Sequence, residues 1–177
     1  MSKSQKHFAA PPRRGNGRGI VIGAALFALA LLAGVTVWQG TQQSRTHATL
    51  AEAGLGDVAM TVYKSPTCEC CGKWIAIMRK EGFTIDVVDR VDMSPIKSRL
   101  GVPNSAVSCH TATIGDYVVE GHVPAADILR VLTDRPPVVG IAVPGMPTGS
   151  PGMDGPSVRY TVVSFDRNGE LKTFAER

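Results

Sequence analysis

Short apolar segments, separated by polar or glycine-containing turns, run through the sequence from residue 57 to its end. Alternating apolar and polar residues predict strands, whereas apolar residues spaced three or four apart predict helices. In the predicted helix that ends before Gly82, for example, Trp74, Ile75 and Met78 share one face. In chain order, the predicted elements are strand 58–63, helix 71–81, strand 83–88, helix 94–100, strands 111–114 and 117–120, and helix 124–133.

This order, β-α-β-α-β-β-α, predicts an α/β domain with a thioredoxin-like fold. The first two strands are joined through a helix and should be parallel, whereas the last two meet at Gly115-Asp116 as an antiparallel hairpin. A stretch rich in proline and glycine, residues 143–156, follows the last of these helices. A second hairpin, with strands 159–165 and 170–174, is then expected to extend or cover the sheet.

The N-terminal part has a different pattern, because residues 20–37 are apolar or small and carry no charge. At about 1.5 Å per residue a helix of this length approaches the hydrocarbon thickness of a bilayer. Five Lys or Arg and no acidic residue precede it, which favours a cytoplasmic N-terminus and export of the rest. We therefore predict a basic tail (1–19), a transmembrane anchor (20–38), a flexible tether (39–56) and a metal-binding domain (57–177) on the periplasmic side of a bacterial inner membrane. A cleaved signal peptide is the less favoured alternative.

Charge is distributed unevenly between these parts. Of the formal net charge of +4, residues 1–56 contribute +5, from six basic residues and one acidic residue, and the remainder contributes −1. The basic character therefore belongs to the tail, and the predicted domain lacks the positive surface expected of a nucleic-acid-binding protein.

Three of the four cysteines occur together in Cys68-Glu69-Cys70-Cys71, between the first strand and the first helix of the domain. The start of a helix stabilises thiolate, which both attacks disulfides and binds soft metals. Cys68 and Cys71 have the C-x-x-C spacing of thiol–disulfide oxidoreductases, in which the first cysteine attacks and the second resolves. The same spacing also grips one metal ion, and the extra thiol of Cys70 favours a soft ion such as Cu(I).

The fourth cysteine, Cys109, is followed by His110 just before the third strand of the domain. In a thioredoxin-like sheet this loop faces the cysteine-bearing helix start, and thioredoxins have a cis-proline there that this sequence lacks. A sulfur and an imidazole at that place suit a soft-metal shell. Two simpler interpretations stay open: His110 as a surface or capping residue, and a stabilising disulfide from Cys70 or Cys71 to Cys109.

Three further residues are weaker candidates. His122, at the turn after the fourth strand, is more readily interpreted as structural or capping. Met146 and Met153 lie in the glycine- and proline-rich stretch, where thioethers of an exported protein are typical Cu(I) ligands. The alternative, equally weighted, is that these methionines cover the edge of the sheet.

Taken together, these motifs resemble the CopG-type family of bacterial exported metal-binding proteins, long catalogued as a domain of unknown function. The resemblance spans about residues 58–175 and rests on motifs in a fixed order: YKSPTCECCGKW (63–74), SCHT (108–111), EGHVP (120–124) and VPGMPTGSPGM (143–153). It implies a thioredoxin-like fold, periplasmic placement, a role in copper resistance and copper held at the C-x-C-C cysteines, as a cluster with Cu(I)/Cu(II) redox activity. By position it singles out Cys68, Cys70, Cys71, Cys109 and His110.

The leading hypothesis is therefore a membrane-tethered copper-binding protein with Cu(I) on Cys68, Cys70 and Cys71 and with Cys109 or His110 completing the shell. Its expected partners are copper ions and a copper efflux or chaperone protein, with no nucleic acid. A thiol–disulfide oxidoreductase that uses Cys68 and Cys71 is the alternative. A copper carrier without redox change is the third hypothesis.

Overall fold

The computed structural model describes residues 59–177. The predicted basic tail, membrane anchor and tether therefore lie outside the described residues. Within residues 59–177, no helix has the length and apolar character needed to cross a membrane.

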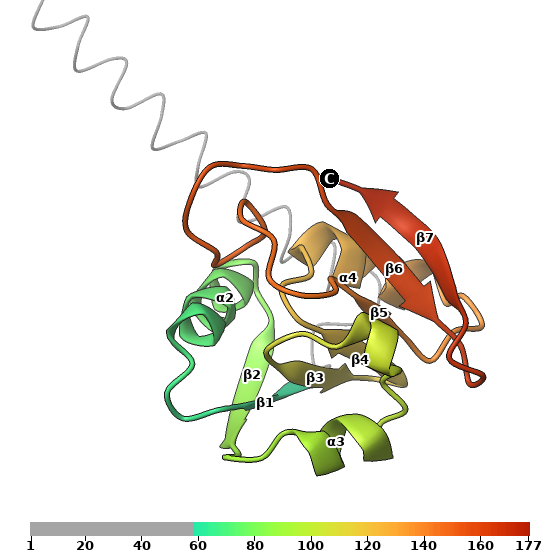
Figure 1. Cartoon of the computed structure of the whole chain (residues 1–177), viewed down its shortest axis with the longest axis horizontal. Helices are drawn as coiled ribbons and strands as arrows, with labels where there is room; N and C mark the ends of the chain where they lie inside the picture. Colours follow the sequence, from blue (N-terminus) through green and yellow to red (C-terminus); the bar gives the residue numbers. More distant parts are fainter. Residues whose placement is uncertain (1–58) are drawn as a thin grey trace, which may run out of the picture. The chain divides into compact units, whose positions relative to one another are not determined.

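A seven-stranded mixed sheet, with strand order β2-β1-β3-β4-β5-β6-β7, forms the centre of the domain (Figure 1). β1 and β2 are parallel, and β3 and β4 form an antiparallel hairpin, so the α/β class and both predicted pairings are confirmed. The elements are β1 (Ala59–Lys64), α2 (Glu69–Lys80), β2 (Thr84–Asp89), α3 (Ser94–Arg99), the 3-10 helix η1 (Asn104–Ala106), β3 (Thr111–Ile114), β4 (Tyr117–Glu120), α4 (Ala125–Asp134), β5 (Gly140–Ala142), β6 (Thr161–Phe165) and β7 (Leu171–Glu176).

β5, which the sequence pattern does not predict, pairs in parallel with β4 and antiparallel with β6. Three apolar residues are too few to indicate a strand by periodicity. Its first residue, Gly140, lies so close to β4 and β6 that a Cβ there would overlap the Val118 carbonyl and approach Phe165 Cζ to 2.7 Å. Because β5 bridges β4 and β6, the C-terminal hairpin extends the sheet and does not cover it.

Helix α2 begins at Glu69, two residues earlier than predicted, with Cys68 as its N-cap. Cys68 is extended, and its N–H donates to the Ser65 carbonyl (3.1 Å), so a tight turn leads directly from β1 into the helix. This turn places Cys70 and Cys71 in the first helical turn.

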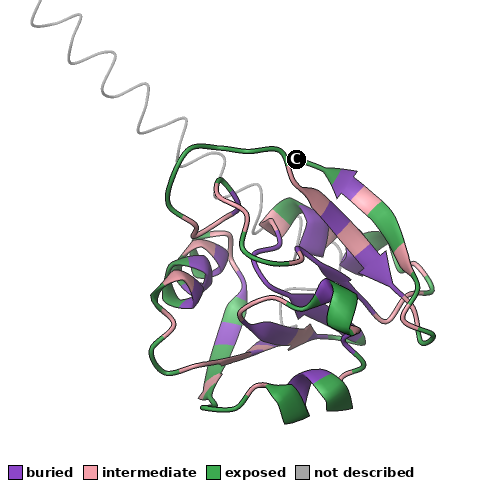
Figure 2. Cartoon of the chain, viewed as in Figure 1, coloured by how far each residue is buried: buried purple, intermediate pink, exposed green. Residues whose placement is uncertain are grey.

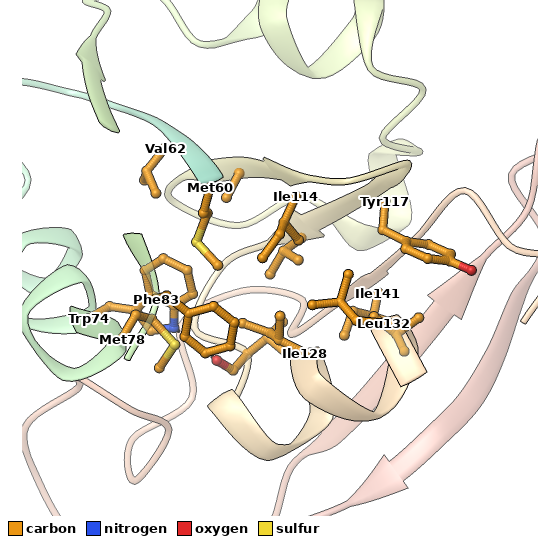
Figure 3. Packing of buried hydrophobic residues seen from close by; sticks show 14 of the residues in the cluster. Met60, Val62, Trp74, Met78, Phe83, Ile114, Tyr117, Ile128, Leu132 and Ile141 are labelled. Atoms are coloured by element: carbon orange, nitrogen blue, oxygen red, sulfur yellow. Dashed lines mark hydrogen bonds between the residues drawn. The ribbon is translucent and has the colours of Figure 1, made fainter. Parts of the chain in front are cut away.

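The larger apolar core packs α2 and α4 against the sheet (Figures 2 and 3). Trp74, Ile75 and Met78 of α2 are buried as predicted, and so are Ile128 and Leu132 of α4. Burial of large side chains is worth about 1.5–3 kcal/mol each. The Trp74 indole N–H also donates to the Val123 carbonyl (2.9 Å), which ties α2 to the turn after β4 and brings two parts of the candidate site together.

Candidate metal centre

The cysteine turn is closed by a disulfide between Cys68 and Cys71, whose Cα atoms are 5.4 Å apart. Cys70 and Cys109 are free thiols, and Cys70 Sγ lies 3.5 Å from Cys68 Sγ. The alternative interpretation, a stabilising disulfide from Cys70 or Cys71 to Cys109, is therefore wrong. The C-x-x-C spacing within one helical turn brings Cys68 and Cys71 closer to each other than a longer loop would.

Sheet register brings Cys109 to this turn. β3 is antiparallel to β1. The first residue of β3, Thr111, pairs with Tyr63, the second-to-last residue of β1. The residues just before β3 therefore lie beside the residues just after β1. As a result, the sulfur atoms of all four cysteines lie within 4.8 Å of one another.

His122 belongs to the same site, although the sequence analysis favoured a structural or capping role for it. Its side chain is fully buried, and its Nε2 lies 2.9 Å from Cys109 Sγ. Its Nδ1 lies 2.7 Å from the Pro151 carbonyl oxygen, and only an Nδ1–H can donate to that oxygen. Nε2 then keeps its lone pair, which is the tautomer of a histidine that binds metal through Nε2.

A signal for His122 was present in the predicted hairpin. A two-residue turn between 114 and 117 pairs Thr111 with Glu120, as the structure shows. The next position joins His110 to Gly121, whose N–H donates to the His110 carbonyl, and His122 directly follows Gly121 in the chain. The turn after β4 therefore brings the two histidines close together. Their ring centroids are 5.1 Å apart.

His110 is completely buried, so the interpretation as a surface residue is wrong. Its ring lies 4.5 Å from the Trp74 ring, centroid to centroid, and its Nδ1 is 3.4 Å from Cys109 Sγ. Its Nε2 is buried and has no hydrogen-bond partner within residues 59–177, an arrangement that is costly unless another ligand satisfies it. Burial holds the pKa of His110 well below its usual value, helped by His122 and Lys97, so the imidazole is neutral and able to coordinate.

Burial has the opposite effect on Cys109, where it raises the thiol pKa to about 12, helped by the nearby Cys70 sulfur. Burial also lowers the pKa of His122, against the effect of its bond to Pro151. Without a cation the Cys109 sulfur is therefore a thiol, and binding of a metal ion would release its proton. Cys109, His110 and His122 form a second group of ligand atoms within 4.8 Å of one another. The two groups share the Cys109 sulfur.

The loop of residues 143–156 packs against both halves of the site. Besides the His122–Pro151 bond, Gly152 lies against the start of α2, since a Cβ there would be 3.0 Å from the Cys70 carbonyl oxygen. Gly145 pairs with Ser108, next to Cys109, in an isolated β-bridge. Met146, the next residue, is 56% exposed.

Met153 directly follows Gly152 in this loop and is only partly buried. Two cavities of about 670 and 610 Å³ lie around the β6–β7 turn, and no cysteine lines either. These cavities are therefore separate from the compact set of sulfur and nitrogen atoms that forms the candidate metal centre.

The fold and this cluster define a mixed α/β protein with a cysteine–histidine centre able to bind metal. Two solved structures are similar to it: copper resistance protein CopG in form 2 (TM-score 0.65) and in form 1 (TM-score 0.64). Each is 47% identical and covers 68% of this chain, which in turn covers 98% and 97% of those chains. The chain belongs to the CopG-type family. A family model described as protein of unknown function DUF411 matches residues 106–153, and no curated protein matches the chain.

Proposed function

We propose that this chain is an exported copper-binding protein of copper resistance that holds Cu(I) on its cysteine cluster. The observation that carries the proposal is the pair of ligand groups sharing Cys109: four sulfurs on one side, and two imidazoles on the other. A sulfur shared in this way is suited to bridge two ions, which favours a polynuclear copper–thiolate cluster. The copper resistance proteins to which the chain is similar support the choice of metal.

The residues present fit Cu(I) well. Thiolates select Cu(I), and imidazoles suit copper. Within residues 59–177 the buried Nε2 of His110 has no hydrogen-bond partner, and the Nε2 lone pair of His122 faces the Cys109 sulfur. Met146 and Met153 remain candidate thioether ligands, because their loop packs on the cysteine turn.

The Cys68–Cys71 disulfide connects copper binding to redox chemistry. Opening it consumes two electrons and two protons and supplies two thiols, so the full sulfur set exists only in the reduced chain. Closing it from the dithiol releases two electrons, enough to reduce two Cu(II) to Cu(I). On this basis we infer that the chain is a copper oxidoreductase. In the alternative, a carrier without redox change, the cysteines would stay reduced while copper is bound.

The remaining parts of the proposal concern location. We propose that the domain is a thioredoxin-like module lengthened by β5, β6 and β7, on the periplasmic side of the inner membrane, where residues 20–38 anchor it. A copper efflux or chaperone protein would receive or supply the ion there.

Anaerobic titration of the reduced full-length chain with Cu(I), followed by X-ray absorption, tests the metal assignment. We expect more than one copper per chain, with mostly sulfur neighbours and a minority of nitrogen. Cys70→Ser and His122→Asn should each weaken binding, and His122→Asn should remove nitrogen neighbours. His47→Asn, which precedes the domain in sequence, is the matched control. Zinc alone, or no metal, would contradict the proposal.

The disulfide itself favours a second function, that of a thiol–disulfide oxidoreductase. Cys68 is partly exposed and Cys71 is buried, as expected of an attacking and a resolving cysteine. This function predicts that reduction of insulin by the chain survives Cys70→Ser and Cys109→Ser. Loss of turnover in those variants, together with tight copper binding by the wild-type chain, would favour the copper site.

A further inference from the structure

A buried ion pair lies behind the candidate metal centre, outside the set of ligands. It joins Lys97 of α3 to Glu120, the last residue of β4. The Lys97 side chain is 11% exposed and that of Glu120 is 0% exposed. Burying two charges is not stabilising in itself, because the desolvation cost offsets their attraction. The pair therefore needs an explanation other than stability.

The hydrogen bonds of Glu120 explain why the ion pair is there. Its Oε1 accepts the Lys97 ammonium and also the backbone N–H of Ser108 at 2.7 Å. Its Oε2 accepts the Thr111 hydroxyl at 2.7 Å, and Lys97 donates to that hydroxyl oxygen at 3.0 Å. Ser108 directly precedes Cys109 and Thr111 directly follows His110. One carboxylate thus holds both ends of the segment that carries two of the candidate ligands.

Other contacts fix the same segment from the side. The Ser108 hydroxyl donates to the Gly145 carbonyl, and the Gly121 N–H donates to the His110 carbonyl at 2.9 Å. Gly121 has a φ of +72°, and a Cβ there would overlap the Ser108 side chain. The backbone around Cys109 therefore has little freedom as long as Glu120 holds its two ends.

We propose that Glu120, oriented by its ion pair with Lys97, is a positioning residue that holds segment 108–111 so that Cys109 lies at the cysteine turn with His110 beside it. The inference concerns the geometry of the metal-free chain, and its consequence for copper rests on the proposed function. Hydrogen bonds to a carboxylate are shorter and stronger than those to a neutral acceptor, which suits this task. Loss of residues that orient metal ligands typically lowers metal affinity about 10- to 100-fold.

The test uses two double variants that both remove the two buried charges. Lys97→Met with Glu120→Gln keeps an amide oxygen that can accept the Ser108 N–H. Lys97→Met with Glu120→Met keeps no acceptor. Since neither variant leaves an unpaired buried charge, both should fold, which thermal unfolding of the metal-free chain checks.

The first readout needs no metal. In a Cys70→Ser background with the disulfide intact, Cys109 is the one free thiol, and its rate of alkylation by iodoacetamide reports how often segment 108–111 opens. We expect alkylation about tenfold faster in the Glu120→Met variant, equivalent to a tenfold larger open population, and near the wild-type rate in the Glu120→Gln variant. Equal alkylation rates in the two double variants and in the protein with Lys97 and Glu120 intact, all folded and all carrying Cys70→Ser, would overturn the proposal.

The second readout is Cu(I) affinity of the reduced full-length chain. The Glu120→Met double variant should bind about 10- to 100-fold more weakly, and adding Cys109→Ser to it should cause little further loss, because Cys109 is already displaced. Cys70→Ser, by contrast, should weaken binding equally in both backgrounds. A full additional loss on adding Cys109→Ser would also overturn the proposal.

These two readouts separate the inference from the proposed function. If the wild-type chain does not bind copper, the proposed function fails, while the alkylation rates still decide whether Glu120 holds the segment. If the Glu120→Met variant does not fold, Thr111→Val replaces it. This change removes the Thr111 hydroxyl, and with it the contacts to Glu120 Oε2 and to Lys97, while the Ser108 N–H keeps its bond to Oε1. Faster Cys109 alkylation in Thr111→Val at unchanged melting temperature supports the proposal, and an unchanged rate overturns it.

Discussion

Gly152→Ala should destabilise the domain, because Gly152 is a point where the loop of residues 143–156 packs closely against α2. Its φ is +84°, and an added Cβ would lie 2.7 Å from the Trp74 backbone nitrogen and 3.1 Å from the Trp74 Cα. Both are backbone atoms inside a helix that the core holds in place, so they cannot move aside as a flexible side chain would. The loop must move instead.

The expected loss has two sources. A non-glycine residue with a left-handed backbone costs about 1–2 kcal/mol. Moving the loop also weakens the hydrogen bond from His122 to the Pro151 carbonyl, and such a bond contributes roughly 0.5–1.5 kcal/mol. We therefore expect Gly152→Ala to lower the free energy of unfolding by about 2–3 kcal/mol. For a domain of this size that corresponds to a melting temperature lower by about 8–12 °C.

Gly72→Ala is a matched control, a glycine-to-alanine change in α2 away from the contact with the loop. Gly72 lies in the first turns of α2, and a Cβ there meets nothing within 4 Å. Alanine is the better helix former, so this change should stabilise the domain by about 0.5 kcal/mol. Urea unfolding of the metal-free, disulfide-bonded chain, followed by circular dichroism, measures both. The reasoning fails if Gly152→Ala is as stable as the wild type, or if Gly72→Ala is equally damaging.

Three further predictions concern the thiols, a turn and a buried carboxylate. Alkylation of the denatured, unreduced chain should label two cysteines, Cys70 and Cys109, and prior reduction should raise the count to four by mass spectrometry; a bridged Cys109 would contradict the structure. Hydrogen bonds from backbone N–H groups of the β6–β7 turn, chiefly that of Glu170, hold the pKa of Asp166 below its ordinary value of 3.8. Asp166→Ala should therefore lower the free energy of unfolding at pH values above 3.8. This difference should shrink as the pH falls through the lowered pKa of Asp166, and a pH-independent difference in unfolding free energy would refute the assignment. Arg177→Ala removes the guanidinium that binds fully buried Asp127 through two nitrogens and should lower the urea-measured stability by roughly 2–3 kcal/mol, whereas an unchanged midpoint would show that the bond contributes nothing.

Local patterns in the sequence were enough to predict most of the fold. The hairpin of β3 and β4 was predicted at its observed bounds, because alternating apolar residues flank a two-residue turn. The burial of Trp74 and Met78 followed from their spacing on one helical face. β5 could not be predicted, since its three residues form a strand only through the edges that β4 and β6 offer on either side.

The sequence by itself determined the chemistry of the candidate site: four thiols, three of them within one helical turn, and the hairpin that brings Cys109 back to them. These features depend only on residues that are close together in the chain, so local backbone geometry is enough to produce them. Only the tertiary structure decided which sulfurs are bridged, that His122 contacts Cys109, and that Glu120 holds the segment around it. Each of these depends on atoms brought together from separate strands, where burial and hydrogen-bond direction determine what a side chain does.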